Sequence, residues 1–357
     1  MSSPLAPPTA LWVVPVPELA GVGRHVVDVM RRGVPGWRVV VLCPDGPLAS
    51  ALRDLGVAVL TARVDPGSGF RTASRGIRGV VERLRPALVH SHLAFADVTA
   101  AAATVGLPVA LVSTEHGIAA DDRVYHSTKW LSRTKSLMHA TRLRRLDALI
   151  AVSQSTAHVV RQKWAPPRGL RIRVIPNGVD PLPVPPRPEP GLHIISLARF
   201  APEKGLEHLV RSFALLVAAE HSARMTMAGA GPLLPEIEAL VRERGLEEHV
   251  EFPGFVPAAD LLARGHVLAQ LSRWENCSYS LLDAQIHGLG VVATAVGGNP
   301  EQLPPGCLVR AADHPAVADR LRTQGLDLAA RPRLASEWPT LEAMCAAISE
   351  VYKEVTR

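Results

Sequence analysis

The chain has 357 residues, which at roughly 100–200 residues per domain predicts two domains with sizeable cores. Its net charge of +6 favours anionic partners, but only 4% of the residues are aromatic and no zinc-finger spacing or aromatic RNA-binding signature is present, which argues against nucleic acid. We expect a cytoplasmic protein without a signal peptide, because no apolar run of about 18 residues occurs, prolines interrupt the N-terminus, and the four cysteines lie far apart.

Along the first half of the chain, short apolar and β-branched runs alternate with helical patterns. The predicted strands cover residues 11–14, 39–42, 57–60, 87–90, 109–113, 148–152 and 172–175. Helical patterns lie between most of these strands, for example at 24–30, 74–84 and 156–163. Continuous apolar strands that alternate with helices predict a parallel sheet with helices on both faces.

Six prolines in the ten residues 181–190 interrupt this alternation and predict an extended linker. Further strands are predicted at 194–197, 224–228, 250–252, 267–271 and 291–294. The sequence therefore predicts an α/β fold of two Rossmann-like, doubly wound parallel-sheet domains, at 1–180 and 191–335, facing each other across a cleft. Residues 336–357 hold an amphipathic helix that we expect to pack back toward the N-terminal domain.

The densest candidate site follows the strand predicted at 267–271. Glu275 lies in the loop, and Asp283 lies in the early turns of a helix that begins near 278–280. Both acids can face one cleft, and the backbone N–H groups at 276–280 would form an anion site. A solvated loop followed by an acidic first helical turn has the same spacing, so this alternative stays open.

A second candidate follows the strand predicted at 194–197, where Arg199 and Lys204 lie five residues apart before a helix that begins near Gly205. A planar guanidinium and a point-charge ammonium together suit a diphosphate. A pair of solvated surface cations is the alternative. Glycine-containing loops follow other strands, at 228–232, 253–256 and 297–301.

The predicted N-terminal domain offers a glycine turn and a histidine group. Gly21 opens the first helix, where it would let a ligand approach the backbone or would simply form a tight turn. His90 and His92 end one strand, and His116 follows the next, so these rings could converge. No third ligand follows at matching spacing, so hydrogen-bonded structural roles are favoured and no metal site is expected.

Residues 126–145 have a helical pattern with six Lys and Arg side chains among Trp130, Leu131, Leu137 and Met138. A basic amphipathic helix of this kind can dock on anionic lipid, which would hold the protein at the inner face of a membrane. In that case the acceptor of the reaction considered below would be a lipid or a lipid-linked sugar. A surface helix with a solvated basic face is the alternative.

Taken together and in this order, the motifs resemble those of retaining glycosyltransferase family 4, whose members have the two-domain GT-B fold. The matching motifs are Gly21-x-x-Arg24-His25, Ser153-Gln-Ser155, Ile175-Pro-Asn-Gly-Val-Asp180, Arg199 with Lys204, Glu275-x7-Asp283, and the run from Val291 to Glu301. They span nearly the whole chain. The resemblance implies an acceptor-side domain at 1–180 and a nucleotide-sugar-binding domain at 191–335.

The resemblance also implies roles for individual residues. Arg199 and Lys204 would hold the donor diphosphate. Glu275 would hydrogen-bond hydroxyls of the transferred sugar, and His116 would lie near the reacting centre. The remaining expected contacts are the backbone N–H groups of Asn276, Cys277, Ser278 and Tyr279 with the sugar, Asp283 with the ribose diol, the backbone of Gly254 and Val256 with the base, and Gly21 with phosphates or acceptor.

On this basis we predict a retaining hexosyltransferase that moves a sugar from a nucleotide-diphosphate sugar, with a UDP-sugar as the first choice, to an acceptor hydroxyl in polysaccharide, glycolipid or natural-product glycoside synthesis. No metal or other cofactor is expected, because Arg199 and Lys204 would take the place of a divalent ion. Ala20 and Asp283 stand where the family usually has glycine and glutamate. These departures leave a non-catalytic sugar- or nucleotide-binding protein open, and a nucleotide-sugar epimerase of the same fold is a further alternative.

Overall fold

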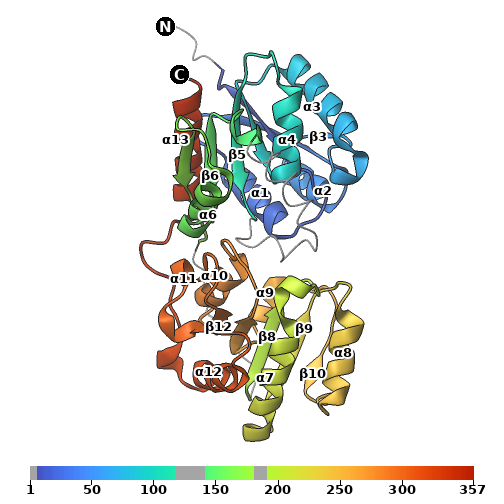
Figure 1. The fold of residues 1–357 in the computed structure, drawn as a ribbon, viewed down its shortest axis with the longest axis vertical. Coiled ribbons are helices and arrows are strands. Elements are labelled where there is room, and N and C mark those ends of the chain that lie inside the picture. Colours follow the sequence, from blue (N-terminus) through green and yellow to red (C-terminus); the bar gives the residue numbers. More distant parts are fainter. Residues whose placement is uncertain (1–5, 118–140, 181–190) are drawn as a thin grey trace. The chain divides into compact units, whose positions relative to one another are not determined.

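The computed structural model describes residues 6–117, 141–180 and 191–357. These residues form two compact units, one of residues 6–117, 141–178 and 339–357 and the other of residues 179–180 and 191–338. Each unit is a parallel sheet covered by helices (Figure 1), so the predicted fold class of two doubly wound α/β domains is confirmed. The linker predicted at 181–190 lies outside the described residues.

The first unit is built on a seven-stranded sheet in the order β3-β2-β1-β4-β5-β6-β7, with every pairing parallel. Its strands are β1 (Thr9–Val13), β2 (Arg38–Cys43), β3 (Ala58–Thr61), β4 (Leu88–His92), β5 (Ala110–Glu115), β6 (Ala148–Ala151) and β7 (Arg171–Val174). Leu11 of the central strand pairs with Val40 on one side and with Val89 on the other. The inner strands are almost wholly buried, as the continuous apolar runs predicted, whereas the edge strands β3 and β7 include exposed residues.

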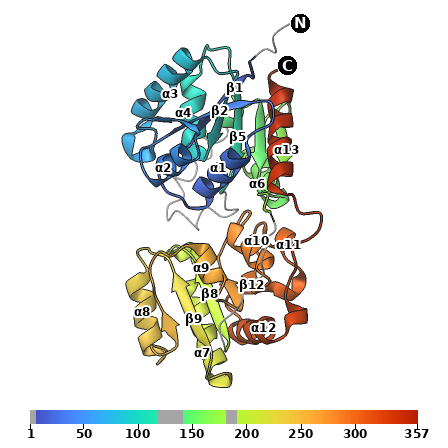
Figure 2. The same ribbon diagram turned by 180° about the vertical axis from the view of Figure 1, so that it is seen from behind.

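The helices and turns of this unit are α1 (Gly21–Arg32), α2 (Pro47–Asp54), η1 (Pro66–Ser68), α3 (Phe70–Leu84), α4 (Ala94–Ala103), α6 (Gln154–Trp164) and α13 (Leu341–Val355). The C-terminal helix α13 packs beside α1 within this unit (Figure 2). Met344, Ile348 and Tyr352 on its buried face join the core that also contains Trp12 of β1. Apolar residues spaced three and four apart thus bury one face of the last helix.

The second unit is built on a six-stranded parallel sheet in the order β10-β9-β8-β11-β12-β13. Its strands are β8 (His193–Leu197), β9 (Arg224–Ala228), β10 (Val250–Glu251), β11 (Val267–Gln270), β12 (Gly290–Thr294) and β13 (Leu308–Val309). The two-residue strand β13 was not predicted. It pairs only Leu308 and Val309 with the end of β12, and a run that short carries no recognisable period.

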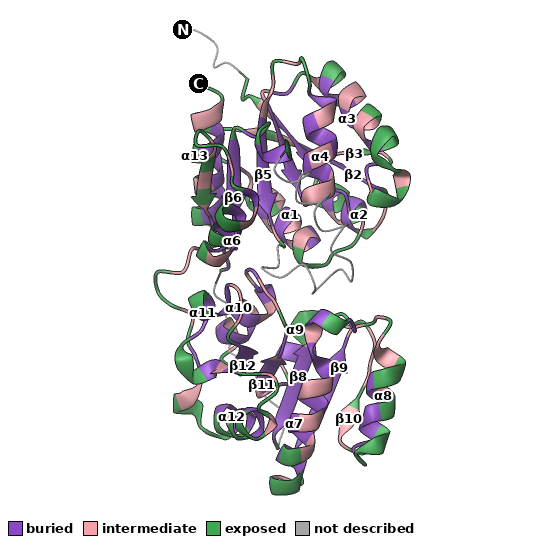
Figure 3. Ribbon diagram, in the orientation of Figure 1, coloured by how far each residue is buried: buried purple, intermediate pink, exposed green. Residues whose placement is uncertain are grey.

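The helices and turns of the second unit are η3 (Pro202–Lys204), α7 (Leu206–Ala219), α8 (Leu234–Glu243), α9 (Ala258–Leu262), α10 (Tyr279–Ile286), α11 (Asn299–Gln302), η4 (Pro305–Cys307), α12 (His314–Leu326) and η5 (Leu328–Ala330). α12 packs against α7 and β12. Strands are buried in both units, while the outer faces of α3 and α8 are exposed (Figure 3).

In both sheets the strand order reverses beside the first strand, between β1 and β4 in the first unit and between β8 and β11 in the second. Loops that leave neighbouring strands in opposite directions open a crevice at the carboxyl ends of those strands, where ligands of such sheets bind. The residues that follow β1, β4, β8 and β11 are therefore the ones to inspect for function.

Only the last residues of the basic segment predicted at 126–145 are described, because residues 118–140 lie outside the described ranges. Arg142, expected on a solvated or lipid-facing basic surface, is instead buried and pairs with Asp97 and with Glu115, whose Oε2 lies 2.6 Å from Arg142 Nη2. Burial lowers the pKa of Arg142 to about 9 and raises the pKa of Glu115 to about 8. Among the described helices, none is long and apolar enough to cross a membrane.

Candidate functional site

In the second unit, loops at the carboxyl ends of β8 and β11 bring Lys204 and Glu275 together. Lys204 Nζ lies 2.6 Å from Glu275 Oε1, and the hydroxyl of Ser272 donates to the same oxygen at 2.7 Å. No described residue donates a hydrogen bond to the other carboxylate oxygen, Oε2. This oxygen is the one left to accept a hydrogen bond from a ligand hydroxyl.

A glycine allows the two loops to approach so closely. Gly205, directly after Lys204, has a φ of 59°, and a Cβ atom there would lie 2.4 Å from the carbonyl oxygen of Leu271. The β8–α7 loop therefore lies against the end of β11, which places Lys204 within reach of Glu275. A side chain at position 205 would force the loops apart.

A second glycine holds the backbone of Glu275. Gly297 has a φ of 53°, and a Cβ atom there would lie 1.7 Å from the carbonyl oxygen of Glu275. That carbonyl accepts a hydrogen bond from the N–H of Gly298 at 3.0 Å. The glycine loop predicted at 297–301 thus fixes the acid of the neighbouring loop.

Arg199 lies in the same β8–α7 loop as Lys204. Its side chain is 69% exposed, and Nη2 lies 2.6 Å from Oε1 of Glu203, a partner that sequence reasoning missed although it is four residues away. Exposed ion pairs contribute only about 0–1 kcal/mol. A diphosphate can therefore compete for the guanidinium at little cost.

The anion site predicted at the start of α10 is altered by Gln302. The N–H of Ser278 donates to Gln302 Oε1 at 3.0 Å, and Gln302 Nε2 donates back to the carbonyl oxygen of Ser278 at 3.0 Å. The expectation that this N–H points at a ligand is therefore wrong for Ser278, because a buried donor takes a protein partner. Asn276 and Cys277 precede it, and Tyr279 begins α10 where a helix was predicted.

The residues expected to contact the nucleoside lie on two elements. Asp283 is half-buried on α10. Gly254 has a φ of 72°, and its carbonyl oxygen accepts from the N–H of Gly229 at 2.7 Å, which ties the loop to the end of β9. Val256 packs against the core, whereas Phe255 beside it is 86% exposed. Sequence reasoning did not single out Phe255, although an exposed aromatic ring in a strand-end loop is suited to stack on a base.

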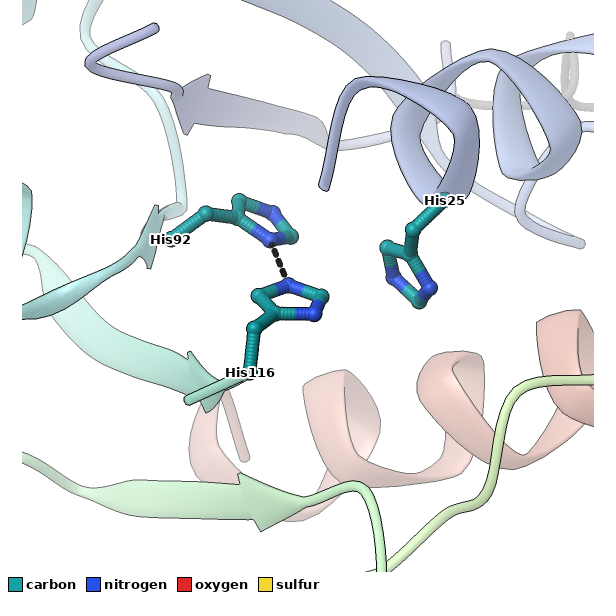
Figure 4. Close-up of side chains that lie close together, drawn as sticks. All are labelled: His25, His92 and His116. Atoms are coloured by element: carbon teal, nitrogen blue, oxygen red, sulfur yellow. Dashed lines mark hydrogen bonds between the residues drawn. The ribbon is translucent and has the colours of Figure 1, made fainter. Parts of the chain in front are cut away.

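In the first unit, His92 ends β4 and His116 directly follows β5. Nδ1 of His92 lies 2.9 Å from Nε2 of His116, so the two rings converge as their strand positions predicted (Figure 4). His25 of α1 joins them, with its ring centroid 4.8 Å from that of His116 and 5.8 Å from that of His92. The sequence analysis missed His25 as a member of this group, because the helix after β1 reaches it only through the strand order.

His90, the fourth histidine of this region, has a structural role. Tyr352 of α13 accepts a hydrogen bond from Trp12 Nε1 at 2.7 Å and lies 2.6 Å from His90 Nδ1. His90 Nε2 lies 2.7 Å from the hydroxyl of Thr114. Because Trp12 only donates, Tyr352 donates to Nδ1 and His90 Nε2 donates to Thr114. Both nitrogens of His90 are thus committed to the protein.

Burial keeps these histidines neutral. It lowers the pKa of His25 to about 4 and lowers the pKa of His92 and His116 well below 6.5, with the neighbouring rings adding to the effect. His116 would therefore meet a substrate as a neutral hydrogen-bonding ring and not as a cation.

The glycine turn at the start of α1 divides its two glycines. Gly21 is the first residue of the helix, and a Cβ atom there would meet nothing within 4 Å. A Cβ atom at Gly23 would lie 2.2 Å from the carbonyl oxygen of Glu18. Close packing therefore requires Gly23, whereas the open space at Gly21 leaves room for a ligand.

Two family models match the chain. Residues 19–181 match the model described as Glycosyltransferase Family 4, and residues 191–324 match the model described as Glycosyl transferases group 1. The chain is 29% identical over 254 residues to a phosphatidylinositol N-acetylglucosaminyltransferase of Arabidopsis thaliana, covering 67% of this chain and 54% of the relative. It is 31% identical over 194 residues to the putative colanic acid biosynthesis glycosyltransferase WcaL of Escherichia coli (strain K12), covering 50% and 47%. The chain thus spans about half the length of these relatives.

Solved structures share the whole fold. Anabaena Alr3699/HepE in complex with UDP-glucose aligns with a TM-score of 0.79 at 18% identity over 98% of both chains. The sucrose-phosphate synthase of Thermosynechococcus elongatus aligns with a TM-score of 0.75 at 17% identity, over 98% of this chain and 95% of that one. The two-domain fold expected from the sequence is therefore confirmed, and the relatives do not favour the epimerase or the non-catalytic alternative.

Proposed function

Since the chain belongs to glycosyltransferase family 4, we propose that it transfers a sugar from a UDP-sugar to an acceptor hydroxyl with retention of configuration. The observation that carries this proposal is the contact between Lys204 and Glu275 at the switch point of the second sheet. A cation for the diphosphate and an acid for the sugar lie side by side where such sheets bind nucleotides.

The proposed chemistry breaks the bond between the anomeric carbon and the β-phosphate oxygen and forms a bond from that carbon to the acceptor oxygen. Negative charge develops on the departing diphosphate, and Lys204 and Arg199 are placed to stabilise it without reorganising. The acceptor proton passes to the departing phosphate on the same face of the sugar. This scheme needs neither a covalent nucleophile nor a divalent ion at the diphosphate.

Glu275 would position the sugar. Its Oε1 already takes hydrogen bonds from Lys204 and Ser272, so Oε2 would accept from a sugar hydroxyl. Binding energy at that hydroxyl would align the anomeric carbon with the acceptor. Loss of the carboxylate should therefore lower turnover more than nucleotide affinity.

The proposed substrates follow the printed names of similar proteins. A UDP donor is supported by the complex of Anabaena HepE with UDP-glucose. A lipid or saccharide acceptor is supported by relatives named for phosphatidylinositol and for colanic acid synthesis. A cytoplasmic location with peripheral membrane contact through residues 126–145 would suit a lipid-linked acceptor.

Calorimetric titration of UDP, GDP, TDP and ADP tests the proposal. One nucleotide, expected to be UDP, should bind the wild type, and an Arg199→Ala/Lys204→Ala variant should lose that binding. Arg322→Ala is the matched control, because Arg322 forms an exposed ion pair with Glu220 elsewhere in the same unit. If no nucleotide binds the folded wild type, the transferase proposal is wrong.

A further inference from the structure

His25, His92 and His116 each offer a ring nitrogen to one point in the first unit. One nitrogen from each ring lies within 4.8 Å of the other two. The rings come from α1, β4 and the residue after β5, which meet where the strand order reverses, and they face one another in Figure 4. Three imidazoles that converge from separate elements have the composition of a transition-metal site.

One of these rings has unused bonding capacity. His92 is fully buried, and its Nε2 has no hydrogen-bond partner among the described residues. An unsatisfied buried polar nitrogen costs about 1–3 kcal/mol, so its presence calls for a ligand. His90, next along the strand face, shows the contrast, since Tyr352 and Thr114 take both of its nitrogens.

Asn177 orients the third ring. His25 Nδ1 lies 3.2 Å from Oδ1 of Asn177, and an amide oxygen can only accept, so Nδ1 carries the proton. The lone pair of His25 is then on Nε2. Metal-binding histidines usually donate their second ring nitrogen to an oxygen in this way, which fixes the tautomer and the ring direction. The buried rings are also neutral at pH 7, the form that binds metals.

We propose that His25, His92 and His116 bind one divalent transition-metal ion of the zinc class, with the fourth position left to water or a ligand. Tetrahedral zinc with bonds of about 2.0–2.1 Å spaces its ligand nitrogens about 3.3 Å apart. The 2.9 Å between His92 Nδ1 and His116 Nε2 lies close to that spacing, and the limit of 4.8 Å requires only a small inward movement. Magnesium and calcium are excluded as occupants because they prefer oxygen ligands.

The site goes beyond the proposed transferase chemistry, which needs no metal at the diphosphate. A bound ion would hold His116 away from a substrate, so we expect Zn²⁺ to inhibit transfer. That consequence rests on the proposed function, whereas metal binding itself does not. The two are separated by measuring binding directly.

The test is competition of the untagged full chain with a chromophoric chelator for Zn²⁺. The wild type should bind one ion per chain, and His25→Gln and His116→Gln should each weaken that binding at least about 100-fold. Asn177→Ala keeps all three rings and should weaken binding about 10–100-fold through loss of orientation. His158→Gln is the control, because His158 is an exposed histidine of α6 in the same unit.

Two checks keep the test decisive. His116 is only half-buried, so His116→Gln should keep the far-ultraviolet circular dichroism of the wild type even if His25→Gln does not. The second unit holds a histidine pair, His208 and His314, with Nδ1 and Nε2 3.1 Å apart. If His208→Gln abolishes tight binding, or if His116→Gln binds zinc as the folded wild type does, the three-histidine site is wrong.

Discussion

Lys204 Nζ lies 2.6 Å from Glu275 Oε1, so the cation expected to hold the donor diphosphate is already paired with the acid expected to hold the donor sugar. The pairing fixes both side chains before a ligand arrives, which lowers the cost of ordering them on binding. It also couples the two halves of the donor, because movement of the ammonium toward phosphate changes the charge that Glu275 experiences.

Lys204→Ala should lower kcat by about 10²–10³, the usual effect of removing one preorganised group that stabilises developing charge. The same change leaves Glu275 without its cation, so donor affinity should fall as well. Steady-state kinetics with the donor identified by calorimetry measure both effects. Arg322→Ala, which removes an exposed cation of the same unit, should leave kcat unchanged. Equal rates for the wild type and Lys204→Ala would contradict the assigned role.

Gly297→Ala should disrupt the site through the backbone. Its Cβ atom would lie 1.7 Å from the carbonyl oxygen of Glu275, and a φ of 53° is strained for alanine. We expect nucleotide affinity to fall at least about tenfold and the thermal midpoint of the second unit to fall. Gly306→Ala is the matched control, because the nearest atom to a Cβ there is an arginine nitrogen at 3.6 Å. Calorimetric binding and differential scanning calorimetry give the two readouts, and unchanged affinity in Gly297→Ala would contradict the proposed packing.

The strands and the order of the motifs could be read from the sequence, because apolar runs and glycine loops are local signals. The contact of Lys204 with Glu275 could be expected only from the family resemblance, since 71 residues separate them and the strand order brings them together. Position along a strand was enough to predict that His92 and His116 converge. His25 was missed because it lies on a helix and reaches the other two only through the position of β1 next to β4.

Other errors arose where tertiary contacts outweighed a local pattern. Arg142 has the sequence context of a basic surface helix, yet two buried carboxylates take its guanidinium. The N–H of Ser278 follows the usual geometry of a helix start, yet Gln302, which lies 24 residues later, satisfies it. Neither partner can be recognised from nearby residues.

Asp283→Glu tests the departure from the family pattern. The longer side chain should keep or improve UDP affinity if this acid contacts the ribose diol. Asp283→Ala should raise the dissociation constant about tenfold, which corresponds to about 1.4 kcal/mol for one charged hydrogen bond. Asp319→Ala changes an exposed acid of α12 and should have no effect. Wild-type UDP binding by Asp283→Ala would remove the residue from the site.

Cys277 should be the thiol that reports on the donor loop. It is half-buried next to Glu275, whereas Cys43, Cys307 and Cys345 are buried. Burial also raises the pKa of Cys43 and of Cys307 to about 11, so little of their reactive thiolate exists at pH 8. A chromogenic disulfide reagent should modify Cys277 first, and saturating UDP should slow that phase. Cys277→Ser should lack the fast phase, and a fast phase that UDP leaves unchanged would place the loop away from the nucleotide.

Arg142→Met should destabilise the first unit by about 3–5 kcal/mol, because it leaves Asp97 and Glu115 buried without their cation. The guanidinium also lies 4.9 Å from the ring centroid of Trp164, so a contact with that ring is lost as well. Arg53→Met is the control, since its pair with Asp45 is exposed and should be worth at most about 1 kcal/mol. The unfolding transition of the first unit, followed by calorimetry, measures the difference between the two variants. Near-equal midpoints would mean that the buried carboxylates are protonated and need no cation.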